Sequence, residues 1–180
     1  MKIFTKSKPF QEYCLKLKKK GTIGFVPTMG CLHEGHLSLI DQSSQKCRFS
    51  IVSIFVNPLQ FGPKEDFSRY PRPRKQDLAL CRQKKVEAVF MPDEHTFYPE
   101  DFSLLIEETM LSTTHCGALR PGHFTGVVTV VSKLLNLTLP DYLFMGQKDY
   151  QQCLVIKRLL RDMDFPVKLI ICPTLRDKDG

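Results

Sequence analysis

Short, near-continuous apolar runs alternate with segments of helical periodicity along most of the chain. Strands that are apolar throughout, and do not alternate apolar with polar residues, are typical of parallel sheets covered on both faces. We therefore predict an α/β fold with a Rossmann-like, doubly wound parallel sheet. The predicted strands are Ile23–Thr28, Phe49–Val56, Ala88–Met91, Asp141–Met145 and Val167–Cys172, with a further strand at Phe102–Glu107.

Helical periodicity occupies the intervals between these strands. The predicted helices are Pro9–Lys20, Gly35–Gln45, Arg74–Lys85, Val127–Leu137 and Tyr150–Met163. Two stretches lack a clear period: Thr109–Gly117 is ambiguous, and Arg120–Gly126 is predicted as a loop that leads into the Val127 helix.

The junction between the first predicted strand and the second helix is the most informative stretch. The apolar run Ile23–Val26 meets Pro27, which cannot donate to a strand ladder and is expected to break the strand. His33 and His36 follow at the helix start, where free N–H groups and the helix dipole favour an anion such as phosphate. Gly30 and Gly35 permit a close approach of the backbone to that anion.

Polar or glycine-rich segments also follow two other predicted strands, at Asn57–Gln60 and Gly146–Asp149. In doubly wound folds the ligand binds at the carboxyl ends of the strands, so these segments are expected to line one site. Lys148 is a candidate clamp on an α-phosphate, or one half of a weak surface pair with Asp149. Gln60 and Gln152 are candidate amides for a hydroxyl or carboxylate of a second substrate, or ordinary surface residues.

Three interpretations of the histidine pair remain open at this point. As metal ligands, His33 and His36 lack a convincing third partner, and we expect no metal site in the protein. As helix-terminal residues they would be structural. As a phosphate-handling pair they would stabilise charge that develops on a transferring nucleotide.

Composition narrows the class of protein. A length of 180 residues suits one domain, and the net charge of +7 indicates an anionic partner, either nucleic acid or a nucleotide. The seven cysteines include no Cys-x-x-Cys pair, which is typical of small core residues in a reducing compartment. No signal peptide is visible, and polar residues interrupt the longest apolar segment, Val127–Leu139. We expect a soluble, cytoplasmic protein without a membrane partner.

A close resemblance to the pantoate–β-alanine ligase (pantothenate synthetase) family begins at Pro27–His36, which reads Pro-Thr-Met-Gly-Cys-Leu-His-Glu-Gly-His. That family belongs to the nucleotidylyltransferase superfamily, whose His-x-Gly-His motif is shared with class I aminoacyl-tRNA synthetases. Further blocks resemble the family in the family's order, and the likeness covers nearly the whole chain. These blocks are Ser53–Phe61, Glu65–Asp66 with Tyr70–Arg72, Arg120–Phe124, Val131–Leu134 and Gly146–Gln152.

The resemblance implies an ATP-dependent, AMP-forming ligase that condenses pantoate with β-alanine through a pantoyl adenylate. It implies His36 as proton donor, with His33 and Lys148 as further catalytic groups. It places pantoate and β-alanine at Gln60 and Gln152, and magnesium with the ATP phosphates. The ATP-binding residues that it implies are Met29, Gly30, Cys31, Leu32, His33, Glu34, Gly35, His36, Gly146, Gln147, Lys148, Asp149 and Leu175.

In the family, a Ser-Ser-Arg-Asn stretch and a smaller lid domain follow the segment that resembles Arg176–Gly180. We expect residues 1–180 to form the N-terminal nucleotide- and pantoate-binding domain, with the C-terminal lid domain absent and little turnover. The family also implies a homodimer.

Two other functions are weighed against this one. The first is another adenylyltransferase or synthetase-like fragment, or a non-catalytic nucleotide-binding domain. The second is a nucleic-acid-binding domain, which the net charge of +7 and the basic cluster Arg69–Lys75 suggest. That cluster lacks interleaved aromatic residues apart from Tyr70, and we expect no nucleic-acid partner.

Overall fold

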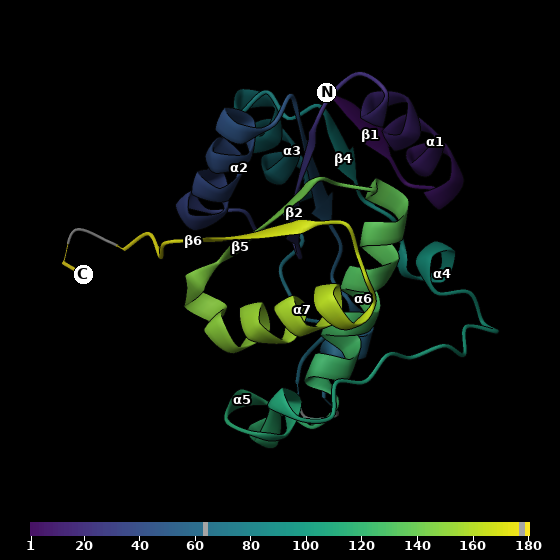
Figure 1. The fold of residues 1–180 in the computed structure, drawn as a ribbon, viewed down its shortest axis with the longest axis vertical. Helices are drawn as coiled ribbons and strands as arrows, with labels where there is room; N and C mark the ends of the chain where they lie inside the picture. The colour runs from purple at the N-terminus through teal and green to yellow at the C-terminus, as the bar shows by residue number, and fades with distance from the viewer. Residues whose placement is uncertain (63–64, 177–178) are drawn as a thin grey trace.

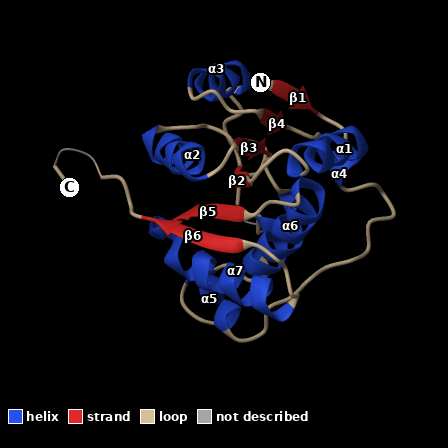
Figure 2. Ribbon diagram, turned by 45° about the horizontal axis from the view of Figure 1, so that its top comes forward, coloured by secondary structure: helices blue, strands red, loops and turns tan. Residues whose placement is uncertain are grey.

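The computed structural model describes residues 1–62, 65–176 and 179–180. Six parallel strands form one sheet in the order β1-β4-β3-β2-β5-β6 (Figure 2). The strands are β1 (Lys2–Phe4), β2 (Ile23–Thr28), β3 (Phe49–Ile54), β4 (Ala88–Phe90), β5 (Tyr142–Gly146) and β6 (Lys168–Cys172). The predicted parallel α/β sheet is confirmed.

Helices cover both faces of this sheet (Figure 1). One face packs against α2 (Glu34–Lys46) and α3 (Arg74–Gln83), and the other against α1 (Ser7–Lys18), α6 (His123–Thr138) and α7 (Tyr150–Asp162). Alternate residues of a strand therefore face different cores. Phe25 belongs to the core with α6, whereas its neighbour Val26 belongs to the core with α2. This double burial explains the continuous apolar runs in the sequence.

The order of the strands reverses beside β2, which lies between β3 and β5. Its register with β3 covers all six residues, but its register with β5 covers only Gly24 and Phe25. The β2–β5 pairing therefore ends before the carboxyl ends of the two strands. Such a reversal is the place where doubly wound folds bind ligands.

Strand β2 has the predicted bounds, but Pro27 does not break the strand, contrary to the expectation for that residue. Pro27 is in register with Ser53, and the strand continues to Thr28. The backbone carbonyl of Ile23 accepts from the Asp141 N–H on the β5 side. Because the backbone groups of alternate residues point to the same neighbouring strand, the nitrogen of Pro27 also points to the β5 side. Because β5 pairing has already ended there, the missing N–H costs no ladder bond.

Several other boundaries differ from the predictions. Phe102–Glu107 is not a strand: the backbone N–H of Ile106 donates to Thr129 Oγ1 of α6, so this segment lies along a helix and not along a strand. Helix α6 begins at His123, four residues before the predicted start, after Gly122 in a left-handed conformation.

Short elements that the patterns did not predict are β1, α4 (Glu94–Phe97) and α5 (Cys116–Leu119), with 3-10 turns at Pro58–Gln60 (η1), Leu111–Thr113 (η2) and Gln147–Asp149 (η3).

Five of the seven cysteines are buried, as expected for small core residues. Within the described ranges no helix has the long apolar stretch that a membrane crossing needs. Part of the Arg176–Gly180 segment lies outside the described residues.

Candidate nucleotide and acid site

The loop that joins β2 to α2 carries two consecutive residues in the left-handed region. Gly30 has φ of 86° and Cys31 has φ of 52°. For a non-glycine residue this conformation costs about 1–2 kcal/mol, so other contacts must hold it. Thr28 supplies one: its hydroxyl donates to the Ser53 carbonyl and accepts from the Gly30 N–H at 3.1 Å.

Asp77 supplies the other contact. Its two carboxylate oxygens accept from the backbone N–H groups of Cys31 (3.0 Å) and Leu32 (2.8 Å). Asp77 lies in the first turn of α3 and is 1% exposed. A buried carboxylate that receives two backbone N–H bonds clamps the loop firmly, since losing either bond would leave a buried charge poorly solvated. Asp77 is not predictable as a site residue from the sequence, because nothing in its local pattern relates α3 to a loop 45 residues earlier.

The histidine pair at the start of α2 is held by the same backbone. His33 Nδ1 accepts from the Gly35 N–H at 3.1 Å, and His36 Nδ1 accepts from the His33 N–H at 3.4 Å. In a neutral imidazole whose Nδ1 accepts, Nε2 carries the proton. Both rings thus offer an Nε2–H donor. Burial, then the neighbouring charge of His33, lowers the pKa of His36 to about 4, so this donor is neutral near pH 7.

These donors face a cavity of about 320 Å³ between the carboxyl ends of β2 and β5. The predicted residues that line it come from three stretches of the chain. Tyr70 and Thr174, which were not predicted, line it too. The predicted ones are Met29, His33, Gly35, His36, Gly146, Lys148, Asp149, Gln152 and Leu175. The Lys148 side chain is 80% exposed and lies 3.9 Å from Asp149, so its charge is available to an anionic ligand.

A second cavity of about 170 Å³ adjoins the first, and His36, Met29 and Gln152 line both. Its walls are apolar, and its polar groups include the amides of Gln60 and Gln152. The apolar walls are Phe55, Val127, Val130, Val131, Leu134 and Met145. A small acid with a branched apolar body and a few oxygens would fit this composition.

Five predicted residues do not line either cavity. Gly30 and Cys31 shape the loop, and the Leu32 side chain packs into the core under α2. Glu34 is exposed in the first turn of α2, and Gln147 lines a shallow groove with Lys148 and Arg176.

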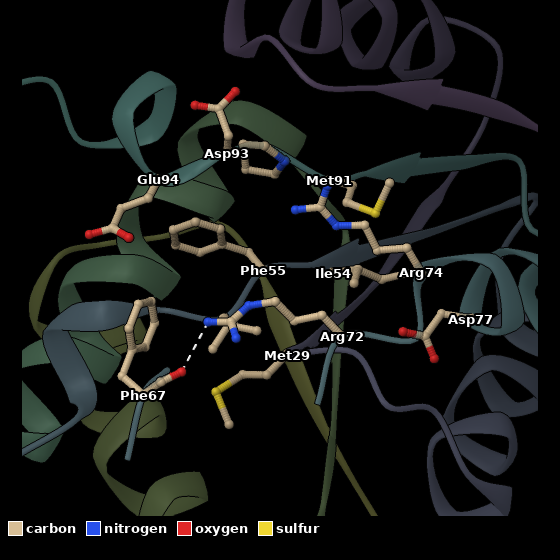
Figure 3. A pocket seen from close by; sticks show the side chains of 12 residues that line it. Met29, Ile54, Phe55, Phe67, Arg72, Arg74, Asp77, Met91, Asp93 and Glu94 are labelled. Atoms are coloured by element: carbon tan, nitrogen blue, oxygen red, sulfur yellow. Dashed lines mark hydrogen bonds between the residues drawn. The ribbon is translucent and has the colours of Figure 1, made fainter. Parts of the chain in front are cut away.

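A third cavity lies beyond Met29, at the ends of β3 and β4 (Figure 3). Arg72 enters it and donates to three backbone carbonyls, including that of Phe67 at 3.0 Å. Arg69 pairs with Asp66 at 2.9 Å. Two cations of the basic cluster therefore stabilise their own loop.

The turn η1 that carries Gln60 is tied to the start of α6. His123 donates from Nδ1 to the Gln60 carbonyl at 2.9 Å, and Arg120 donates to His123 Nε2 at 3.1 Å. Arg120 also forms two bonds with the Glu65 carboxylate, at 2.6 and 3.0 Å. This pairing lowers the pKa of Glu65 to about 2.

The doubly wound sheet and a histidine-bearing helix start at its switch point define a nucleotidylyltransferase-type domain. A family model described as pantoate-beta-alanine ligase matches residues 2–180. The chain belongs to the pantoate–β-alanine ligase family.

Relatives and solved structures agree with this assignment. The chain is 49% identical to pantothenate synthetases of Sulfurihydrogenibium sp. and of Carboxydothermus hydrogenoformans, and covers 65% and 64% of them. It superposes with a TM-score of 0.95 on pantothenate synthetase from Thermus thermophilus (42% identity, 64% of that chain). It superposes equally well on the Francisella tularensis ligase complexed with beta-gamma ATP and beta-alanine (43% identity, 69% of that chain). In each of these matches the chain itself is covered completely. The chain thus spans just under two thirds of the length of its curated relatives.

Proposed function

We propose that residues 1–180 form the ATP- and pantoate-binding domain of an AMP-forming pantoate–β-alanine ligase. The observation that carries this proposal is the contact between the two cavities. The larger is lined by anion-binding groups and the smaller by apolar walls with the amides of Asn57, Gln60 and Gln152, and His36 borders both. A carboxylate bound in the smaller cavity would lie next to a phosphate bound in the larger one.

Two steps follow from this arrangement. A carboxylate oxygen of pantoate attacks the α-phosphorus of ATP, and the bond from that phosphorus to the bridging oxygen breaks, releasing pyrophosphate. The amine of β-alanine then attacks the acyl carbon, loses a proton and displaces AMP. The resulting pantothenate is a precursor of coenzyme A.

Each group has a role that its geometry supports. The Nε2–H groups of His33 and His36 donate to phosphate oxygens, and Lys148 adds positive charge where negative charge develops. Because its pKa lies near 4 in the free protein, His36 donates as a neutral group until a bound phosphate raises its proton affinity. Gln60 and Gln152 hold the acid in the smaller cavity.

The roles proposed for the remaining nucleotide-binding residues rest on the chemistry of the β2–α2 loop and on the family. The backbone from Met29 to Gly35 and the turn Gly146–Asp149 would surround the nucleotide, with Leu175 on the adenine side. Mg²⁺ would enter with ATP, held mainly by phosphate oxygens. We further propose a cytoplasmic enzyme that binds neither membrane nor nucleic acid.

We also propose a homodimer. The extended segment between α4 and α6 exposes the side chains of Leu104 (72%), Leu105 (55%) and Met110 (66%). Exposed apolar groups within seven residues of sequence favour burial against a second copy. Sedimentation of the 180-residue chain tests this, and a monomer at all concentrations would contradict it.

Pantoate-dependent exchange of pyrophosphate into ATP tests the function directly. The exchange rate of the 180-residue chain is compared with that of a full-length relative. Exchange reports the first step alone, which needs only ATP and pantoate. Exchange or ATP binding that increases with pantoate supports the proposal. A folded chain that gives no heat with ATP–Mg²⁺ in calorimetry would contradict it, and AMP formation from a different acid would indicate another adenylyltransferase.

A further inference from the structure

The Gln60 amide is oriented by a chain of hydrogen bonds that extends away from the site. Asn57 Nδ2 donates to Gln60 Oε1 at 3.1 Å and to the Gly126 carbonyl at 3.0 Å. Because a carbonyl can only accept, the nitrogen of the Asn57 amide must face Gly126, and both of its hydrogens are then used. The Asn57 side chain is buried at 1% exposure, so alternative partners in water are excluded.

Tyr98 completes this chain. Its hydroxyl donates to Asn57 Oδ1 at 3.0 Å, the acceptor left over by the arrangement above. The consequence reaches Gln60: since its oxygen is occupied by Asn57, the group it can offer to a ligand is the Nε2 amide. In the structure Nε2 lies 3.0 Å from Met29 Sδ, a weak acceptor that a ligand oxygen would outcompete.

The Tyr98 ring is itself held in place. The Lys133 ammonium lies over the rings of Phe97, Tyr98 and Phe102, with distances to the centroids of 4.8, 5.3 and 4.7 Å. The rings of Tyr98 and Phe102 are 4.7 Å apart, centroid to centroid. Within the described residues Lys133 has no salt-bridge partner, so the aromatic faces are its main electrostatic contact.

We propose that Tyr98 is a positioning residue which, through Asn57, holds the Gln60 amide with its Nε2 toward the smaller cavity. This makes the cavity selective, at that point, for a hydrogen-bond acceptor such as a carboxylate or hydroxyl oxygen of the acid substrate. The inference rests on the proposed function, because it assigns Gln60 to the acid. Tyr98 itself lines neither the smaller cavity nor the larger one.

A double-mutant cycle on the 180-residue chain tests the inference. Tyr98→Phe removes only the hydroxyl, and we expect it to weaken pantoate binding about tenfold, or about 1.4 kcal/mol, in calorimetry without ATP. ATP affinity is expected to change less than about twofold. In a Gln60→Ala background the same change is expected to cost less than about twofold, because its effect passes through Gln60. Tyr142→Phe, on β5, is the matched control.

Equal losses in both backgrounds would overturn the inference and indicate a general structural effect. If Tyr98→Phe does not fold, Phe102→Leu carries the test, since it loosens the ring contact but keeps the hydroxyl; it is expected to weaken pantoate binding severalfold. If the wild-type chain binds pantoate and these variants bind it with the same affinity, this inference alone is overturned. A wild-type chain that binds ATP but no pantoate overturns the proposed acid site as well.

Discussion

The rings of His33 and His36 lie 4.1 Å apart, centroid to centroid, and each is held through Nδ1 by a backbone N–H at the start of α2. The backbone therefore selects the same tautomer for both. A site for an anionic substrate gains two donors whose direction is set before the ligand arrives, which reduces the entropy lost on binding.

His36→Gln is expected to flatten the pH dependence of stability. In the wild-type chain the folded state keeps His36 neutral down to its pKa of about 4, whereas the unfolded state takes up a proton near the ordinary value of 6.5. Stability is therefore lost as pH falls from 6.5 towards 4, by about 2–3 kcal/mol from this group. Urea unfolding at both ends of that window measures the difference. His95→Gln, on α4, is the control, and a wild-type slope in His36→Gln would contradict the assignment.

Asp77→Asn is expected to loosen the loop between β2 and α2. An amide offers one acceptor where the carboxylate offers two, so the N–H of Cys31 or Leu32 would meet an NH₂ group. We expect a loss of about 2–3 kcal/mol in the free energy of unfolding and at least a roughly tenfold loss in ATP affinity. Asp93→Asn, an exposed helix cap on α4, should cost about 1 kcal/mol or less and leave ATP binding intact. Equal ATP binding in both variants would refute the clamp.

Gly126→Ala is expected to displace the turn that carries Gln60. A Cβ at position 126 would lie 2.3 Å from the Leu59 carbonyl oxygen and 2.5 Å from the Gln60 nitrogen, both backbone atoms. We expect a loss of about 1–3 kcal/mol in stability and weaker pantoate binding. Gly146→Ala is the control: a Cβ at position 146 would have no atom within 4 Å, so the melting temperature should be nearly unchanged. Similar melting temperatures for both variants would show that α6 and the turn do not pack as described.

Lys148→Ala is expected to separate binding from stability. The side chain is largely exposed and its distance to Asp149 is long, so its removal should change the free energy of unfolding by less than about 0.5 kcal/mol. ATP affinity should fall about tenfold, as expected for the loss of a charged hydrogen bond to phosphate. Calorimetry and thermal melts measure the two effects. Lys157→Ala, on the exposed side of α7, is the control, and an unchanged ATP affinity would exclude Lys148 from the phosphate site.

The chain's local patterns were sufficient for the fold class. Near-continuous apolar strands such as Phe49–Ile54, where Ser50 and Ser53 are the polar residues, indicate burial on both faces, because no solvent-facing side requires alternating polar residues. The histidines at the start of α2 were recognisable for a similarly local reason: the spacing of three residues places them one helical turn apart. Where the pattern was short it failed, as at β1, whose three residues are stabilised by their pairing with β4.

The tertiary structure alone decided how the site is held. Asp77 clamps Cys31 from a different helix, and Tyr98 orients Asn57 across 41 residues of sequence. Hydrogen bonds between such distant positions depend on how the helices pack on the sheet. The periodicity of apolar residues along the sequence does not predict them. The sequence by itself determined the parallel sheet and the family, and it predicted the chemistry at the strand ends. Only folding decided which buried groups make that chemistry directional, because a buried donor or acceptor is satisfied by whatever the packing brings within reach.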